Sequence, residues 1–172
     1  MKMFLKYKML VSFIFCVVLF VSCRTPQLID TSFNWENREC TIPTKLKFKK
    51  GSTYLSVYSQ IYSQDEQITH NLTATISIRN TNSSDTLYIK QADYHNTSGV
   101  LIRTYVEKPI FVAPLETIEI IINEKDPAGG TGGNFIFSWV QSKKANKPIF
   151  EGVMISTSGQ QGLSFVTNGV DL

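Results

Sequence analysis

Asp93 and His95 are side chains of the kind that bind metal ions, and they lie two positions apart in the sequence. On a β-strand, residues i and i+2 point to the same face, so the carboxylate and the imidazole would lie side by side. Such a pair is half of a metal site, or it is a charge-paired surface histidine. Because no third ligand accompanies them, we predict neither a bound metal nor another cofactor.

A glycine-rich segment over residues 126–134 is the second candidate for ligand chemistry. Four of the five residues at its centre are glycine, which allows the backbone to approach a ligand closely. Exposed N–H groups around Gly130 and Gly132 would form a nest for an anion, and Asp126 and Asn134 would offer oxygen atoms to Ca²⁺. The spacing matches no calcium motif, so a mobile or tightly folded connection between two strands is the simpler alternative.

Two amides, Gln160 and Gln161, lie between glycines in the last predicted turn. They are candidate polar contacts to a ligand, whereas the flanking glycines alone are typical of a tight hairpin. These amides, the glycine-rich segment and the Asp93–His95 pair make up the candidate ligand-binding residues.

The sequence patterns of common enzymes are absent from the chain. It contains no Gly-x-Ser-x-Gly, no Ser-x-x-Lys, no His-Glu-x-x-His and no phosphate-binding loop that ends in Lys-Ser/Thr. The chain has 2 histidines, which are too few for a histidine-rich metal centre. We therefore predict no catalytic residue and a protein that is not an enzyme.

The N-terminus has the layout of a bacterial lipoprotein signal. Three lysines are followed by an uncharged run over residues 9–21, then by Ser22 and Cys23. The run is shorter than the roughly 20 residues that span a bilayer and matches the apolar part of a signal peptide. We predict cleavage before Cys23 and lipidation of its thiol, which places the protein in the cell envelope. An uncleaved membrane anchor and an ordinary secretory signal are the alternatives.

The net charge of +3 comes from this predicted leader. Residues 1–22 hold three lysines and no acid, so the remaining chain carries 14 basic and 14 acidic residues. A neutral exported chain is a poor candidate for nucleic-acid binding. Once Cys23 carries lipid, Cys40 has no partner within the remaining chain, so no disulfide framework is expected.

Residues 23–50 are mostly polar, contain two prolines and show no sustained period, so we predict a tether after the lipidated cysteine. At its end, Lys45, Lys47 and Lys49 alternate with apolar residues, as on a strand with one wet face. These lysines belong either to a solubilising edge strand or to a basic patch that contacts anionic headgroups near the anchor.

From residue 51 onward the sequence is typical of strands. Residues 72–79 alternate apolar and polar side chains with period 2, and about eight such short segments follow one another between polar turns. We predict an all-β fold, an antiparallel Ig-like β-sandwich of about 7–8 strands over residues 51–172, with an open barrel as second choice. Trp139 is expected in its core. The organisation is then a signal peptide (1–22), a lipidated tether (23–50) and one domain (51–172).

Several short motifs occur in a fixed order along this predicted domain. They are Asn71-Leu72-Thr73, Ser77-Ile78-Arg79-Asn80-Thr81, Asp93-Tyr94, Lys108-Pro109-Ile110, Ala113-Pro114-Leu115, Gly129-Gly130-Thr131-Gly132-Gly133-Asn134-Phe135, Val153-Met154-Ile155-Ser156-Thr157 and Gln161-Gly162-Leu163-Ser164-Phe165. In combination the chain resembles the bacterial family named domain of unknown function 3124. The resemblance implies an exported, often lipid-anchored protein with an Ig-like sandwich and no assigned activity. The chain departs from the family pattern at His95, where an aromatic residue is expected, and at Asn168-Gly169, where Arg-Gly is expected.

The anchor and the fold together favour a non-catalytic binding or interaction module in the envelope. Its partners would be the membrane, through the lipid, and an envelope protein. Acidic residues do not directly follow Cys23, which favours a domain that faces the periplasm. A small-ligand or metal-ion binding domain that uses the glycine-rich segment is the alternative, and a hydrolase of an unfamiliar type is the third hypothesis.

Overall fold

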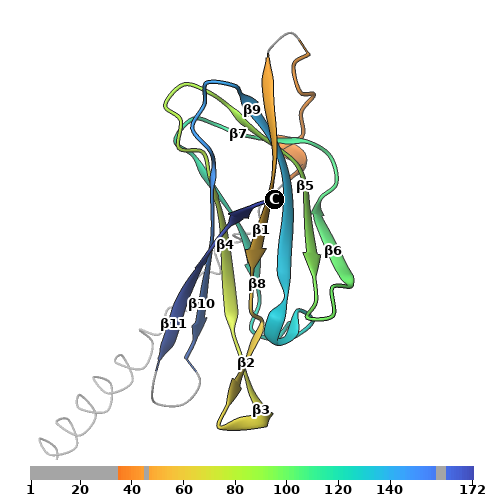
Figure 1. The fold of residues 1–172 in the computed structure, drawn as a ribbon, viewed down its shortest axis with the longest axis vertical. Coiled ribbons are helices and arrows are strands. Elements are labelled where there is room, and N and C mark those ends of the chain that lie inside the picture. The colour runs from red at the N-terminus through yellow and green to blue at the C-terminus, as the bar shows by residue number, and fades with distance from the viewer. Residues whose placement is uncertain (1–34, 45–46, 158–161) are drawn as a thin grey trace, which may run out of the picture. The chain divides into compact units, whose positions relative to one another are not determined.

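The structure is a computed structural model that describes residues 35–44, 47–157 and 162–172. Two antiparallel sheets pack face to face around a single apolar core, which confirms the predicted all-β sandwich (Figure 1). The described residues form twelve strands, more than the 7–8 expected, because several short edge pieces count as strands of their own. The leader and Cys23 lie outside the described residues.

The larger sheet has the strand order β12-β1-β9-β5-β6, and β7 also pairs with β5. The smaller sheet has the order β11-β10-β4-β8, and a separate hairpin joins β2 to β3. The bounds are β1 Phe48–Ser56, β2 Gln60–Ser63, β3 Asp65–Asn71, β4 Thr73–Arg79, β5 Leu87–His95, β6 Leu101–Val106, β7 Ile110–Val112, β8 Thr117–Ile122, β9 Asn134–Ser142, β10 Ile149–Ser156, β11 Leu163–Asn168 and β12 Val170–Asp171, with the 3₁₀ turns η1 Glu36–Arg38 and η2 Gly130–Gly132.

Strict alternation along the strands builds the core. On β4 the even positions are buried, and Ala74, Ile76 and Ile78 are all fully inaccessible to solvent. Aromatic rings from the larger sheet fill the facing side, with Phe135 stacked on Phe137 at a centroid separation of 5.3 Å. Trp139 is buried as predicted, and its indole N–H donates to Thr53 Oγ1 at 2.9 Å. Removing this apolar surface from water is the main force that holds the sheets together.

The strands at the two lateral edges of the sandwich end their sheets in different ways. On one side the chain passes from β11 in the smaller sheet through Gly169 to β12 in the larger sheet, so one strand crosses between the layers. A Cβ at Gly169 would lie 2.9 Å from Cβ of Phe150, which is why the crossing uses glycine. On the other side, β6 and β8 end their sheets, and each pairs with one neighbour within the described residues (Figure 1).

The hairpin of β2 and β3 is a feature that the strand pattern did not predict. Residues 53–61 look like one continuous strand in the sequence, but β1 ends at Ser56 and β2 begins at Gln60. Every residue of β3 is exposed, so the strand lacks the buried alternate positions that a pattern search detects.

Folded structure also extends into the segment predicted as a tether. β1 begins at Phe48, before the expected domain boundary at residue 51, and residues 35–40 lie against β7 and the loop that follows it. No helix in the described part of the chain is long and apolar enough to cross a membrane.

Candidate functional site

The glycine-rich loop lies between β8 and β9 and is bound to the β5–β6 turn. The backbone N–H and the hydroxyl of Thr97 both donate to the carbonyl of Gly129, each at 3.1 Å. The same hydroxyl accepts a hydrogen bond from the N–H of Gly132 at 2.9 Å. One threonine therefore engages the loop at two points.

The segment that follows β1 binds the other side of this loop. The N–H of Ser59 donates to the carbonyl of Gly130 at 3.2 Å, and the N–H of Val57 donates to the carbonyl of Gly133 at 2.9 Å. A Cβ at Gly129 would lie 1.9 Å from the Tyr94 hydroxyl oxygen, so no side chain fits there. The glycines thus allow close packing of the chain on itself, which agrees with a structural connection between two strands.

The acidic residue Asp126 of the loop already has partners in the chain. Asp126 forms an ion pair with Arg103 of β6 at 3.1 Å, and it accepts the N–H of Ala128 at 3.2 Å. Asn134 opens β9 and stands opposite His95 of β5 in the sheet. These contacts bring the loop and the end of β5 together at one end of the sandwich.

Asp93 and His95 are both partly exposed, and they alternate with the buried Tyr94, so they share the outer face of the larger sheet as predicted. Asp93 accepts hydrogen bonds from the Thr104 hydroxyl at 2.8 Å and from the Gln91 amide at 2.7 Å. The Nδ1 atom of His95 is buried and makes no hydrogen bond. Within the described residues, no group of three or more His, Cys, Asp or Glu side chains is placed to hold a metal ion.

The structure thus gathers the predicted candidates Asp93, His95, Asp126, Gly130, Gly132 and Asn134 at one end of the fold. Gln160 and Gln161 lie outside the described residues. Ligand binding by this set stays a prediction. The carboxylates of Asp93 and Asp126 already bind neighbouring residues of the chain.

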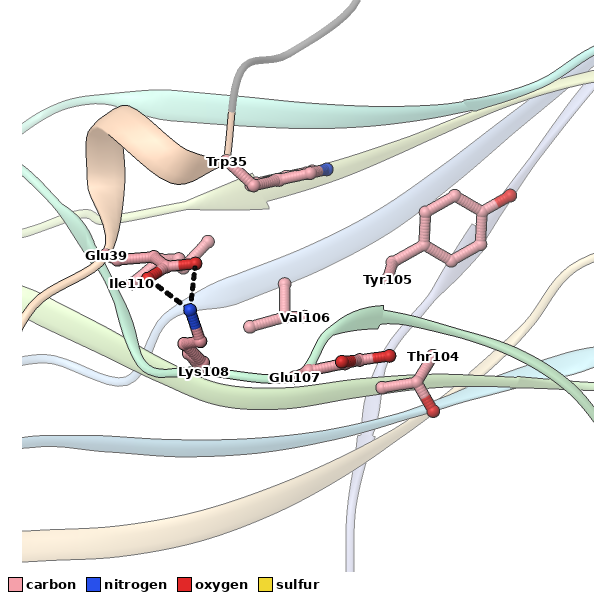
Figure 2. A pocket seen from close by; sticks show the side chains of 8 residues that line it. All are labelled: Trp35, Glu39, Thr104, Tyr105, Val106, Glu107, Lys108 and Ile110. Atoms are coloured by element: carbon pink, nitrogen blue, oxygen red, sulfur yellow. Dashed lines mark hydrogen bonds and ion pairs between the residues drawn. The ribbon is translucent and has the colours of Figure 1, made fainter.

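A pocket of about 300 Å³ opens beside β6, at the margin of the larger sheet (Figure 2). The N-terminal segment forms one wall, and the end of β6 with the turn into β7 forms the other. Its lining combines two aromatic rings, two aliphatic side chains and four polar or charged ones. They are Trp35, Glu39, Thr104, Tyr105, Val106, Glu107, Lys108 and Ile110.

Arg38 binds the first wall of this pocket to the sandwich. Its guanidinium forms a two-pronged ion pair with Glu116, with nitrogen–oxygen distances of 2.5 and 2.9 Å, and lies 5.6 Å from the Phe111 ring centroid. Glu116 also accepts the N–H of Ala113 at 2.7 Å. Arg38 and this backbone N–H hold the pKa of Glu116 below its ordinary value, against the opposing effect of partial burial.

Backbone pairing continues the same attachment. Glu39 forms an antiparallel bridge with Ile110, and the N–H of Cys40 donates to the carbonyl of Pro109 at 2.8 Å. Lys108 and Glu39 form an exposed ion pair at 2.9 Å across the pocket, drawn in Figure 2, and this contact raises the pKa of Lys108. Partial burial raises the pKa of the Cys40 thiol.

Tyr105 connects the pocket to the core. Its ring lies 5.5 Å from that of Phe135, and its hydroxyl accepts a hydrogen bond from Arg103 at 2.5 Å. Burial raises the pKa of Tyr105, and the Arg103 contact opposes that effect. Because Arg103 also binds Asp126, one arginine links the pocket to the glycine-rich loop.

The charges of the lining do not cancel. Glu39 and Lys108 neutralise each other, which leaves Glu107 as an exposed carboxylate that forms no ion pair with any described residue. The pocket therefore offers aromatic and aliphatic surface together with a negative charge.

The sequence did not predict this pocket, because its two walls are some seventy residues apart in the chain. One wall contains Trp35, and the other lies between Thr104 and Ile110. The sequence did contain one indication of a contact here. Trp35 is unusual in a polar tether, because a large apolar ring in such a segment commonly packs on another surface, and Arg38 is close to it in the chain.

Comparison with known proteins places the chain in a family. The family described as "Protein of unknown function (DUF3124)" matches residues 50–172, which is most of the chain. The chain belongs to this family. The matched range covers the sandwich from β1 to β12 and confirms the resemblance seen in the sequence.

Two further comparisons add little to the family assignment. No curated protein matches the chain. Among solved structures, the chain is similar to one titled "Crystal Structure of Thermotoga maritima 1070", with 6% sequence identity and a TM-score of 0.45 over 70% of this chain and 92% of that one.

Proposed function

We propose that this protein is a lipid-anchored envelope protein whose β-sandwich is a non-catalytic binding module, and that the partner binds at the pocket beside β6. The observation that carries the proposal is the pocket itself. It combines aromatic and aliphatic surface with an unpaired carboxylate, beside a strand whose outer edge is open within the described residues. Buried apolar contact with a few convergent polar groups is the usual composition of a binding site.

The open edge suggests the shape of the partner. An extended polypeptide segment pairs readily with a sheet edge, and its alternate side chains then enter neighbouring pockets. Asp93 and Thr104 bind each other on the outer face of this margin, so the surface beside the edge is ordered before a partner arrives.

The unpaired carboxylate suggests the chemistry of the partner. Glu107 favours a cationic group, because an ammonium or guanidinium group in the pocket would form an ion pair with it. The Tyr105 ring shows that a guanidinium is stable at this margin, since that of Arg103 lies 5.3 Å from its centroid. A lysine or arginine side chain of an envelope protein fits the charge requirement.

Capture from envelope extracts with matched baits tests the pocket. Glu107→Gln removes the charge at the pocket, and Glu66→Gln removes a similarly exposed charge on β3, far from it. Trp35→Ala and Tyr62→Ala form a second pair, since Tyr62 is a 60% exposed aromatic residue on the hairpin. We expect the two pocket variants to lose the partner and the two hairpin variants to keep it. Equal capture by all four baits would contradict the proposal.

The anchor is tested separately by intact mass. Protein extracted from the membrane should begin at Cys23 and carry lipid, and Cys23→Ala should lose both features. A full-length mass without lipid would instead mean that the apolar run over residues 9–21 is retained, and the localisation in the envelope would have to be argued afresh.

Binding of a small ligand or metal ion by the glycine-rich loop is the second candidate function. The unpartnered Nδ1 atom of His95, close to Asn134, is the observation in its favour. A thermal-shift screen with divalent cations, phosphates and sugars decides it, because a ligand that binds only the folded state raises the melting temperature. A flat response throughout would remove this candidate.

A further inference from the structure

Lysines gather at the end of the sandwich where β1 begins and β9 ends. Antiparallel pairing sets Phe48 opposite Ser142, and the N–H of Lys143 donates to the carbonyl of Lys47 at 3.2 Å. Two lysine-rich segments that are far apart in the sequence therefore meet side by side. We name this surface the lysine end, and it consists of Lys47, Lys49, Lys50, Lys143, Lys144 and Lys147.

Most of these ammonium groups have no opposite charge beside them. Lys147 pairs with Asp171, and Lys49 lies 6.0 Å from the Trp139 ring centroid. The other four form no ion pair with any residue that the structure describes. Like charges that gather on one surface repel one another, so a cluster without counter-charges lowers the stability of the fold.

Protection of a sheet edge explains only part of the cluster. β12 pairs with β1 at Thr53 and Tyr54, so among the residues that the structure describes the beginning of β1 has an open edge, which Lys49 and Lys50 blunt. Lys143 and Lys144 are exposed in the turn after β9, beyond the end of the strand, where no edge needs such protection.

The same end of the fold receives the N-terminal segment. Paired residues on neighbouring strands form one row across the larger sheet, and this row ends at Gly51, directly after Lys49 and Lys50. The row consists of Glu39, Ile110, Ile89, Trp139 and Gly51. The covalent chain from Cys23 to Trp35 spans twelve residue steps, which limits their separation to roughly 40 Å. A lipid on Cys23 would thus hold the sandwich within reach of the bilayer, and the charges decide which end faces it.

We propose that the lysine end docks on the anionic lipid headgroups of the membrane that holds the anchor. Each lysine close to an anionic leaflet favours adsorption, and salt at physiological strength confines the attraction to within about 10 Å of the surface. The opposite end carries Asp65, Glu66 and Glu124, which form no ion pair with any described residue, so the charge distribution also orients the domain with that end away from the surface. This inference rests on the anchor of the proposed function and is independent of the β6 pocket.

Amine labelling of the full chain in vesicles tests the inference. The protein is reconstituted in vesicles of phosphatidylcholine alone or mixed with phosphatidylglycerol, labelled with an acylating reagent, and analysed by peptide mass spectrometry. Lys125, in the loop at the opposite end, serves as the internal reference. We expect labelling of Lys143 and Lys144 relative to Lys125 to fall roughly fivefold in the anionic vesicles, and high salt to restore it.

Variants and competitors complete the experiment. Lys143→Gln with Lys144→Gln should abolish the protection of Lys50, and Lys125→Gln should leave it unchanged. The inference is overturned if labelling is the same in both vesicle types. It is also overturned if inorganic phosphate, a nucleic acid or an acidic protein protects the lysines as well as the vesicles do. Intact mass, measured first, distinguishes loss of the anchor from failure of the lysine end.

Discussion

The glycine-rich loop and the β6 pocket both border β6, but the chain uses their polar groups in different ways. In the loop, Thr97 and Ser59 bind the backbone of the glycines, and Arg103 binds Asp126. In the pocket, Glu107 is exposed without an ion pair among the described residues. The loop therefore resembles a structural connection, whereas the pocket keeps a charged group that a proposed partner could bind.

This contrast shows that an unusual composition can serve packing within the fold. Four glycines within five positions attract notice in a sequence, yet here they allow a close approach of Gly129 to Tyr94. The pocket residues are ordinary in type, and only the fold brings Trp35 next to Tyr105. Variants that change one region and leave the other unchanged test whether the loop is held by packing and the pocket wall by Arg38.

The largest expected effect is loss of stability on substitution within the loop. Gly129→Ala places a Cβ 1.9 Å from the hydroxyl oxygen of Tyr94, which is fully buried and stacked on Phe135 at 4.8 Å. We expect the free energy of unfolding to fall by about 3 kcal/mol, because an overpacked core must shift. Denaturant unfolding measures the change.

Gly162→Ala is the matched control, because a Cβ there meets nothing within 4 Å. Its free energy of unfolding should equal that of the wild type or exceed it by up to about 1 kcal/mol, because alanine restricts the unfolded chain. If Gly129→Ala were equally neutral, the loop would have room to spare, and its glycines would need an explanation other than packing.

The second effect concerns the wall of the pocket. Arg38→Ala removes the two-pronged ion pair with Glu116, for an expected loss of about 2 kcal/mol, since the carboxylate keeps its Ala113 contact but loses its counter-charge. The segment should then detach, and Cys40, which is half-buried, should be alkylated faster. Peptide mapping after a timed alkylation follows that residue. An unchanged rate would show that other contacts hold the segment.

Acid should weaken the same attachment more mildly. Since the folded pKa of Glu116 is lowered, its contribution is complete above the ordinary glutamate pKa of about 4.3 and is lost as the pH falls through the lowered folded value. The effect should be smaller than that of Arg38→Ala, because a protonated carboxyl can still accept hydrogen bonds.

Denaturant unfolding across the acid range measures this contribution, with Glu116→Gln as the control. The difference in stability between wild type and variant should shrink as the pH falls below 4.3. A difference that is independent of pH would show that the charge on Glu116 does not matter.

The smallest effect is expected at the rim of the pocket. Lys108→Ala breaks an ion pair whose lysine side chain is 71% exposed, and such pairs add little to stability in water. Unfolding and Cys40 alkylation should both match the wild type. Faster alkylation would mean that the Lys108–Glu39 pair, and not only Arg38, fastens the wall.

The sequence predicted the parts of the fold that depend on local alternation. Ile76 and Ile78 are buried where the period-2 pattern places them, and Trp139 lies in the core. The hairpin at β3 was not predicted, because a strand exposed at every position has no such pattern. The face shared by Asp93 and His95 was predicted correctly from strand geometry alone.

The pocket could not be predicted in the same way, because it depends on contacts between distant residues. The residues around Arg38 do not predict Glu116 as its partner, and the residues around Glu39 do not predict its bridge to Ile110. The polar composition of residues 23–50 suggested a tether throughout, although its described end is folded onto the sandwich.

Site-specific photo-crosslinking in the cell envelope tests whether a partner binds at the β6 pocket. A photoreactive residue is placed at Lys108, an exposed lining position whose loss should be neutral, in one variant and at Lys125, near the glycine-rich loop, in another. We expect a discrete adduct from position 108 that disappears with Trp35→Ala and persists with Tyr62→Ala, and no adduct from position 125. An adduct from position 125 alone would contradict binding at the pocket and would make the glycine-rich loop the binding surface.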